Sequence, residues 1–225
     1  MATPALMLAG ATGLVGKQAL ERVLRAGNWT VCVPARSDLG VRHARLQVAV
    51  GDLDNAATLA RIEDDLPALD AFACAIGTTL KKAGSAAAFA AVDRDLVLAL
   101  ARLARRRGAR HAVVVSSVGA VAGSSNLYLR VKGEMEAGIE ALGFERCDFL
   151  QPGLLLGARG ERRPGEHFAQ RLAPLYNPLL RGPLRRYRAV ESAAVAAALV
   201  VLLQDAGPGT RRWDNVGIED LARRG

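Results

Sequence analysis

The sequence predicts an α/β domain built on a doubly wound parallel sheet. Short runs of β-branched and apolar residues alternate with segments of helical periodicity through the first two thirds of the chain. A glycine-rich turn, GATGLVG, directly follows the first of these runs. The 225 residues are enough for one domain with a buried core and too few for two domains joined by a linker. We therefore expect residues 1–225 to form a single domain.

The expected elements alternate in the order that a βαβ fold requires. Strands are expected at residues 5–9, 30–35, 46–50, 71–75, 111–116 and 147–151. Helices are expected at residues 14–26, 56–64, 86–107, 128–142 and 191–204. Residues 157–190 are rich in Gly, Pro and Arg, with one short helix expected near 167–172, and we expect a small cap there that faces the substrate. Residues 205–225 are expected to be a C-terminal extension.

Composition and charge exclude several classes of protein. The net charge of +8 comes from basic residues spread along the whole chain, and aromatic residues make up only 4%, so no nucleic-acid-binding surface is expected. The longest apolar run, 193–203, is too short to span a membrane, and the N-terminus lacks the basic residues of a secretory signal. We therefore expect a cytoplasmic protein. Because the cysteines and histidines share no metal-ligand spacing, we expect no metal, and we expect reduced core thiols at Cys32, Cys74 and Cys147.

The turn GATGLVG, residues 10–16, carries the cofactor prediction. Its glycines Gly10, Gly13 and Gly16 lie between an expected strand and an expected helix, so backbone amides at the helix start can face a pyrophosphate without obstruction by a Cβ atom. A glycine triplet alone is a weak signal, but the apolar strand before it and the amphipathic helix after it strengthen it. The turn predicts a Rossmann-type sheet that binds a dinucleotide; the alternative is a turn without a ligand.

The ends of the next two strands indicate which dinucleotide is preferred. An acidic residue after the second strand would accept hydrogen bonds from the ribose 2′-OH, but the sequence has Ala35 there, followed by Arg36, whose guanidinium suits a 2′-phosphate. NADP(H) is therefore favoured, although a surface arginine that ends the strand is the alternative. The third strand ends in Asp52 and Leu53, which would lie near the adenine, with Asp52 accepting from its amine; a turn aspartate fits equally well.

Tyr128 and Lys132 form a second constellation, one helical turn apart on one face of an expected helix. A lysine ammonium near a phenol lowers the pKa of the phenol from about 10 toward values useful for proton transfer to or from a carbonyl oxygen. The preceding strand ends in Ser116 and Ser117, and a serine hydroxyl there would hold that oxygen. These residues predict a carbonyl oxidoreductase; an accidental match of a tyrosine and a lysine in a structural helix is the alternative.

In this order, the glycine turn, Ser117, Tyr128 and Lys132 resemble the short-chain dehydrogenase/reductase superfamily. The runs VVVSSVGA, NLYLRVKGEMEAGIEALGF and FLQPGLLLGAR are similar to its small atypical branch of Tat-interacting-protein-like oxidoreductases and their bacterial relatives. Because Ser-Val-Gly after the strand fits that pattern, the resemblance favours Ser117 over Ser116 as the catalytic serine. It departs at Asp93, where active reductases often have Asn, a change that would either disturb a proton relay or change its partner.

The resemblance implies binding of NADP(H) and assigns residues to each part of the cofactor. Those assigned are Gly10, Thr12, Gly13, Leu14, Val15 and Gly16 at the phosphates, Arg36 at the 2′-phosphate, Ala75, Ile76 and Gly77 beside the cofactor, Tyr128 and Lys132 at the nicotinamide end with Lys132 on its ribose, and Pro152, Gly153 and Leu154 by the carboxamide.

Two functions from different classes fit these residues. The first is an NADPH-dependent oxidoreductase in which Tyr128 acts as acid or base on a small-molecule substrate, Lys132 tunes it and Ser117 orients the oxygen. The second is a regulator or assembly factor that senses NADPH and works through a protein partner, because the fold alone cannot separate the two. A pure sensor has no use for a tuned phenol, so the enzyme is favoured. The substrate and the oligomeric state stay open.

Overall fold

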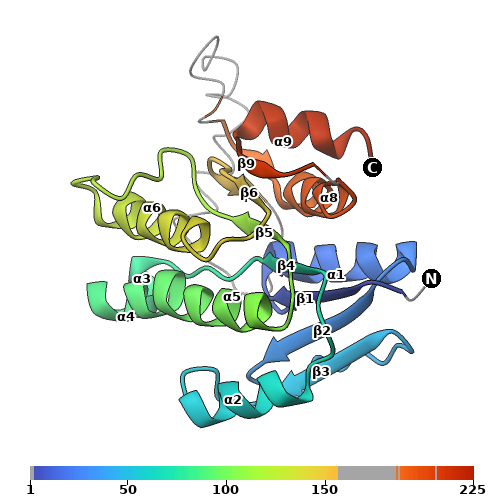
Figure 1. The fold of residues 1–225 in the computed structure, drawn as a ribbon. Coiled ribbons are helices and arrows are strands. Elements are labelled where there is room, and N and C mark those ends of the chain that lie inside the picture. Colours follow the sequence, from blue (N-terminus) through green and yellow to red (C-terminus); the bar gives the residue numbers. More distant parts are fainter. Residues whose placement is uncertain (1–2, 157–185, 187, 206) are drawn as a thin grey trace.

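Seven parallel strands form one sheet through the middle of the molecule (Figure 1). The computed structural model describes residues 3–156, 186, 188–205 and 207–225. Across the sheet the strand order is β3-β2-β1-β4-β5-β6-β9. The strands are β1 (Ala5–Ala9), β2 (Thr30–Ala35), β3 (Leu46–Val50), β4 (Ala71–Cys74), β5 (His111–Val115), β6 (Arg146–Leu150) and β9 (Gly209–Trp213).

Helices cover both faces of this sheet, because alternate side chains of each strand point to opposite faces. In β1, Leu6 and Leu8 join one hydrophobic cluster, which α1, α8 and α9 complete, while Met7 joins another cluster with α2, α5 and α6. Figure 1 shows these two helical layers. The helices are α1 (Leu14–Ala26), α2 (Ala56–Asp65), α3 (Leu80–Ala83), α4 (Ala86–Ala90), the π-helical turn η1 (Ala91–Leu96), α5 (Val97–Arg106), α6 (Leu127–Glu140), α8 (Ser192–Leu202) and α9 (Asn215–Ala222).

The direction of strand addition reverses between β1 and β4, which are neighbours in the sheet. From β1 the chain builds β2 and β3 on one side, and from β4 it builds β5, β6 and finally β9 on the other. Ligands of open parallel sheets bind outside the carboxyl ends of the strands at such a switch point. The glycine turn, the segment 75–77, the serines 116–117 and the segment 152–154 all follow strands of this sheet, so the fold places them at the same edge.

The structure confirms the expected fold class and adds elements that the sequence patterns did not predict. The helix expected at 86–107 is one helical run from Ala86 to Arg106, in which the π-helical turn η1 joins α4 to α5. The segment 205–225, expected to be an extension, contains β9 and α9, and β9 pairs with β6 as the seventh strand. A separate two-stranded parallel sheet joins β7 (Leu155–Leu156) to β8 (Val190–Glu191). Most of the expected cap, including the helix expected near 167–172, lies outside the described residues.

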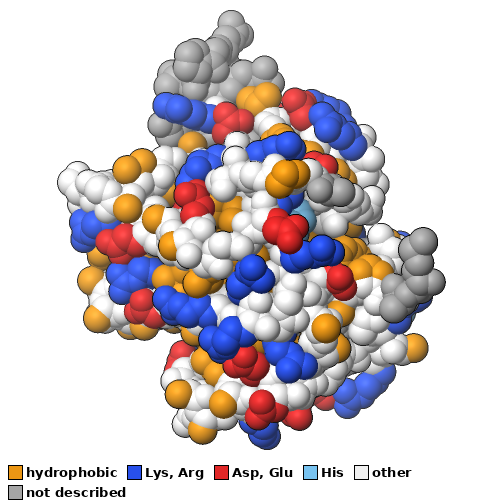
Figure 2. Space-filling model, in the orientation of Figure 1, with side chains coloured by type: hydrophobic (Ala, Val, Ile, Leu, Met, Phe, Trp, Pro, Cys, Tyr) orange, Lys and Arg blue, Asp and Glu red, His pale blue; other side chains and the backbone are white. Residues whose placement is uncertain are grey.

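The surface carries both signs of charge. Figure 2 shows Lys and Arg side chains interspersed with Asp and Glu over the visible face, as expected for basic residues spread along the chain. Within the described ranges, no helix combines the length and the apolar character that a membrane crossing requires.

Candidate functional site

The glycine turn brings β1, α1 and the end of β4 into close contact. Gly10 has φ +82°, and a Cβ atom on it would lie 2.6 Å from the backbone nitrogen of Ile76. A Cβ atom on Gly16 would lie 2.1 Å from the carbonyl oxygen of Gly10, so neither position accepts a side chain without rearrangement. The structure therefore brings together two groups of residues that the sequence assigned to the cofactor.

The start of α1 is open to an anion. Gly13 is the N-cap residue, its backbone N–H donates to the carbonyl of Gly10 at 2.9 Å, and no side chain caps the helix. The first turn of α1, all of which the structure describes, contains no acidic residue. Free amides at the positive end of a helix dipole are a binding site for phosphate groups. This cradle, shaped by glycines, fits a dinucleotide pyrophosphate.

The residues after β2 and β3 differ in whether their polar side chains are available to bind a ligand. Ala35 is buried, while Arg36 is exposed and has no partner among the residues described. The carboxylate of Asp52 accepts a hydrogen bond from the backbone N–H of Asp54 at 3.1 Å, which is the arrangement of a turn aspartate. Leu53 is buried in the core. Arg36 is thus free to meet a ligand, whereas the carboxylate of Asp52 already has a partner in its own turn.

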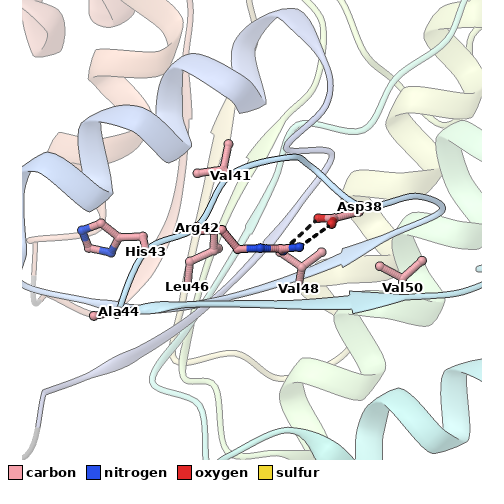
Figure 3. Close-up of a pocket in the computed structure, with 8 residues that line it drawn as sticks. All are labelled: Asp38, Val41, Arg42, His43, Ala44, Leu46, Val48 and Val50. Atoms are coloured by element: carbon pink, nitrogen blue, oxygen red, sulfur yellow. Dashed lines mark hydrogen bonds and ion pairs between the residues drawn. The ribbon is translucent and has the colours of Figure 1, made fainter.

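A pocket that the sequence did not indicate lies between the loop after β2 and the strand β3. It has a volume of about 580 Å³ and is formed by the loop after β2 and the outer strand β3, below α1 (Figure 3). Within it, the guanidinium of Arg42 pairs with Asp38 at 3.0 Å. Its lining residues are Asp38, Val41, Arg42, His43, Ala44, Leu46, Val48 and Val50. They became neighbours through the folding of a loop back along an edge strand, which leaves no periodic signal in the sequence.

The two serines directly follow β5 and lie against the loop that follows β6. Ser116 and Ser117 are both buried, and the hydroxyl of Ser116 has no hydrogen-bond partner in the part of the chain that the structure describes. The next backbone N–H, of Val118, donates to the carbonyl of Pro152 at 3.0 Å. The N–H of Gly153 donates to Asn215 at 2.9 Å. The serine segment and the segment assigned to the carboxamide therefore lie side by side.

Tyr128 lies in the first turn of α6, where Asn126 caps the helix by accepting from the N–H of Leu129 at 3.2 Å. Its ring is half-buried and stacks on Phe89 of α4, with centroids 5.5 Å apart and an interplanar angle of 29°. The loop after Ser117 packs on the same helix, because a Cβ atom on Gly133 would lie 2.2 Å from the backbone of that loop. The aromatic contact and the helix cap hold the phenol at this edge of the sheet.

Lys132 is buried and forms an ion pair with Asp93, the residue at which the sequence departs from the reductase pattern. The ammonium nitrogen lies 2.8 Å from Oδ1 of Asp93, and both side chains are at most 5% exposed. The other carboxylate oxygen accepts the backbone N–H of Thr78 at 2.8 Å. A Cβ atom on Gly77 would lie 3.6 Å from the carboxylate and 3.7 Å from the ammonium. The departure therefore gives Lys132 a direct partner beside the segment assigned to the cofactor.

The charge of Lys132 is stabilised despite its burial. Burial lowers the pKa of the ammonium, but the Asp93 carboxylate, the phenol of Tyr128 and the thiol of Cys74 raise it, and the net pKa lies above the usual value for lysine. Burial also raises the pKa of Cys74 to about 11, so this thiol is neutral at physiological pH. Lys132 is thus a fixed positive charge in an apolar setting.

A second buried carboxylate, Glu136, marks a pocket of about 650 Å³ between α6, the loop after Ser117 and the end of β9. It accepts hydrogen bonds from Gln151 at 2.9 Å and from Arg212 at 2.8 Å. The pocket is lined by residues 118–122, Gly133, Glu136, Ala137, Gln151, Arg186, Arg212 and Asp214. Sequence reasoning missed it because no strand was expected at β9.

Comparisons with known proteins support the resemblance stated from the sequence. Over 98 residues the chain is 51% identical to protein HTATIP2 of Rattus norvegicus, an alignment that spans 44% of this chain and 40% of the rat protein. It is 33% identical to the mitochondrial protein fmp52 of Aspergillus fumigatus over 228 residues, with 97% of each chain covered. The name of this full-length relative contradicts the expected cytoplasmic location. The composition of the first residues was therefore an insufficient basis for assigning a compartment.

The fold and the family agree. The solved structure of the Bordetella bronchiseptica enzyme WbmH in complex with NAD⁺ superposes with a TM-score of 0.69 at 17% identity, covering 98% of this chain and 79% of WbmH, which shows a shared fold. The sequence model of the NAD dependent epimerase/dehydratase family matches residues 6–135, from β1 and the glycine turn through Lys132. More than half of the chain, including the glycine cradle and the buried lysine, thus follows a family of nicotinamide-dependent enzymes, and the chain belongs to the NAD dependent epimerase/dehydratase family.

Proposed function

We propose that this chain is an NADPH-dependent oxidoreductase of the short-chain dehydrogenase type, acting on a small molecule with a carbonyl or a related carbon. One observation carries the proposal: the buried ammonium of Lys132 lies beside Gly77, at the edge of the sheet where the glycine cradle opens. A fixed cation there suits the hydroxyls of a nicotinamide ribose, and Tyr128, one turn earlier on α6, is the available acid or base.

The cofactor fits the residues present. Glycines stand at Gly10 and Gly16, where a Cβ atom would collide with the backbone that shapes the cradle. In the proposal the amides at the start of α1 hold the pyrophosphate, Arg36 holds the 2′-phosphate and Lys132 the nicotinamide ribose. Pro152, Gly153 and Leu154 lie by the carboxamide. The bound nicotinamide supplies or accepts a hydride at C4.

The chain's own residues move the proton. In the reducing direction the phenol of Tyr128 donates its proton to the substrate oxygen, and in the oxidising direction the phenolate takes a proton from the substrate hydroxyl. The hydroxyl of Ser117 orients that oxygen. The stacking of Tyr128 on Phe89 limits the rotation of the ring and keeps the phenol in one position.

Titration of the purified protein with NADPH and with NADH tests the cofactor. We expect tighter binding of NADPH, and in Arg36→Ala the preference for NADPH falls because the 2′-phosphate loses its guanidinium. Arg42→Ala is the matched control, since Arg42 lies on the same loop but is paired with Asp38. Equal affinity of the natural protein for both nucleotides contradicts the role of Arg36.

Turnover tests the chemistry. A panel of carbonyl compounds and alcohols, followed at the nicotinamide absorbance, is expected to yield at least one substrate. With that substrate, Tyr128→Phe is expected to lose turnover and keep its affinity for NADPH, because only the proton donor is removed. Turnover by Tyr128→Phe at the natural rate refutes the assignment.

A dinucleotide-binding regulator that works through a protein partner is the second candidate, and the ion pair of Lys132 favours it. The carboxylate of Asp93 offsets the positive charge that would otherwise act on the phenol. Binding of NADPH without turnover of any panel compound, together with a partner that is released when NADPH is added, supports this candidate over the enzyme.

A further inference from the structure

A π-helical turn places a carboxylate inside the candidate site. The helical run from Ala86 to Arg106 widens at η1, and π-helical turns in α-helices occur frequently at functional sites. Asp93 lies in this turn with no exposed surface, in contact with the layer formed by α6. A buried carboxylate is costly unless every oxygen is partnered, so its contacts show what it does.

Both oxygens of Asp93 contact groups of the candidate site, Oδ1 through an ion pair and Oδ2 through a hydrogen bond. Oδ1 lies 2.8 Å from the ammonium of Lys132, and Oδ2 accepts the N–H of Thr78 at 2.8 Å. Thr78 follows Gly77 on the segment after β4, which the sequence assigned to the cofactor. A single carboxylate thus joins three separate parts of the fold: η1, α6 and the loop after β4.

The ammonium keeps hydrogen-bonding capacity for a ligand. A lysine has three N–H donors, and within the described part of the chain Asp93 is the one side chain that pairs with Lys132. The pair lies next to the backbone of Gly77, and because this residue has no side chain, no Cβ atom separates the ammonium from that backbone. The remaining N–H donors are therefore available to a ligand bound at the edge of the sheet where the glycine cradle opens.

A neighbouring ion pair provides a contrast on the same two elements. Arg94 of η1 pairs with Glu134 of α6 at 2.6 Å, but these side chains are 33% and 32% exposed. Both pairs link η1 to α6. Exposed pairs contribute little because solvent screens them, whereas the burial of Asp93 and Lys132 makes each charge depend on the other.

We propose that Asp93 is a positioning residue for dinucleotide binding: it holds the Lys132 ammonium charged and directed at the nicotinamide ribose. The inference rests on the proposed function only through dinucleotide binding, which the enzyme and the regulator share. Without the carboxylate, the lowering of the ammonium pKa by burial loses its main opposing interaction, so the ammonium loses its proton at lower pH and no longer serves as a fixed cation. The other titratable groups that face Lys132 are the phenol of Tyr128 and the thiol of Cys74, and the thiol, whose pKa burial raises to about 11, carries no charge at physiological pH that could replace Asp93.

The test is the pH dependence of nucleotide affinity, measured by fluorescence titration with NADPH from about pH 6 to about pH 9, the range in which an unpaired buried lysine titrates. The natural protein is expected to show little change in Kd. Asp93→Asn keeps the acceptor for Thr78 but loses the charge, and its Kd is expected to rise about tenfold or more between these limits, as expected when a charged contact loses its proton. Arg94→Gln is the matched control and is expected to follow the natural protein.

A thermodynamic cycle separates positioning from general damage. In Lys132→Met the pH dependence is expected to be absent, and adding Asp93→Asn to that variant is expected to leave Kd unchanged. Asp93→Glu, which keeps the charge on a longer arm, is expected to bind more weakly with a flat pH profile. Circular dichroism establishes that each variant is folded, and the Lys132→Met background supplies a neutral pair if Asp93→Asn alone does not fold.

Three results overturn the proposal. One is an Asp93→Asn protein that binds NADPH as the natural protein does at every pH. Another is an Asp93→Asn effect that persists undiminished in the Lys132→Met background. The third is a pH profile of Asp93→Glu as steep as that of Asp93→Asn. If the natural protein binds neither NADPH nor NADH, the proposed function itself fails, which is a different result from all three.

Discussion

Two buried carboxylates, Asp93 and Asp148, lie in the same scaffold and are partnered in different ways. Asp148 accepts hydrogen bonds from Trp213 at 2.7 Å, contacts His111 at 2.9 Å and is bridged by Arg146. All of its partners are side chains of the strands β5, β6 and β9. Asp93, by contrast, contacts one ammonium and one backbone N–H.

The difference teaches how a structural buried charge is distinguished from a functional one. The guanidinium of Arg146 also contacts Asp205 at 2.8 Å and the carbonyl of Gly207 at 3.0 Å. The polar groups of this cluster therefore bind one another, and the cluster links the last strand to the sheet through Trp213. The partner of Asp93 retains donors and faces a glycine at the ligand edge. We therefore expect removal of Asp148 to affect stability and removal of Asp93 to affect binding.

The largest expected effect comes from Asp148→Ala. Removing Asp148 leaves the buried Arg146 with the half-exposed Asp205 as its remaining carboxylate partner in the described residues, and the free energy of unfolding is expected to fall by about 4 kcal/mol. Urea unfolding measures this loss. NADPH affinity of the folded fraction is expected to stay unchanged, and a loss below about 1 kcal/mol contradicts the structural role of the cluster.

The second prediction concerns Lys132→Met, which leaves the Asp93 carboxylate buried without its cation. The free energy of unfolding is expected to fall by about 3 kcal/mol, and Asp93→Asn added to it is expected to restore most of that loss, because an uncharged pair replaces an isolated charge. Thermal or urea unfolding of the single and double variants checks this. A double variant less stable than Lys132→Met shows that the two side chains are not coupled.

Acid is expected to weaken the Asp148 cluster. Burial raises the pKa of Asp148, but hydrogen bonds from His111, Arg146 and Trp213 lower it, and the net pKa lies below the ordinary value. A depressed pKa contributes stability that is complete above the unfolded pKa of about 3.9 and is lost as the pH falls through the folded pKa, about 1.4 kcal/mol for each unit of depression. The unfolding free energy below about pH 4 should decline less in Asp148→Asn than in the natural protein. Equal slopes contradict this assignment.

The smallest expected effect separates the two serines. The buried hydroxyl of Ser116 has no hydrogen-bond partner within the residues that the structure describes, so Ser116→Ala is expected to change the free energy of unfolding by less than about 1 kcal/mol. Once a substrate is known, Ser117→Ala is expected to lose turnover while Ser116→Ala keeps it. The opposite outcome assigns the catalytic hydroxyl to Ser116.

Regions that bury a regular face could be predicted from the sequence. The strands at 5–9 and 30–35 have the bounds expected, because their apolar and β-branched runs are buried. The strand at 46–50 also has the bounds expected, although it is only partly buried at the edge of the sheet. The strand β9, with the sequence GTRRW, was missed because four of its five residues are exposed and it has no apolar run. It belongs to the sheet because Trp213 reaches Asp148 and Arg212 reaches Glu136, contacts with residues distant in the chain.

The sequence by itself determined the order of the first six strands of the sheet, the glycine turn and the Ala35-Arg36 pair at the end of β2, because these depend on periodicity and on the local demands of the backbone. Only the tertiary structure decided the partner of Lys132. The sequence marked Asp93 as a departure from the reductase pattern but left its partner open, and that partner depends on a π-helical turn that packs against α6. Electrostatic contacts between elements arise from packing, which no local pattern encodes.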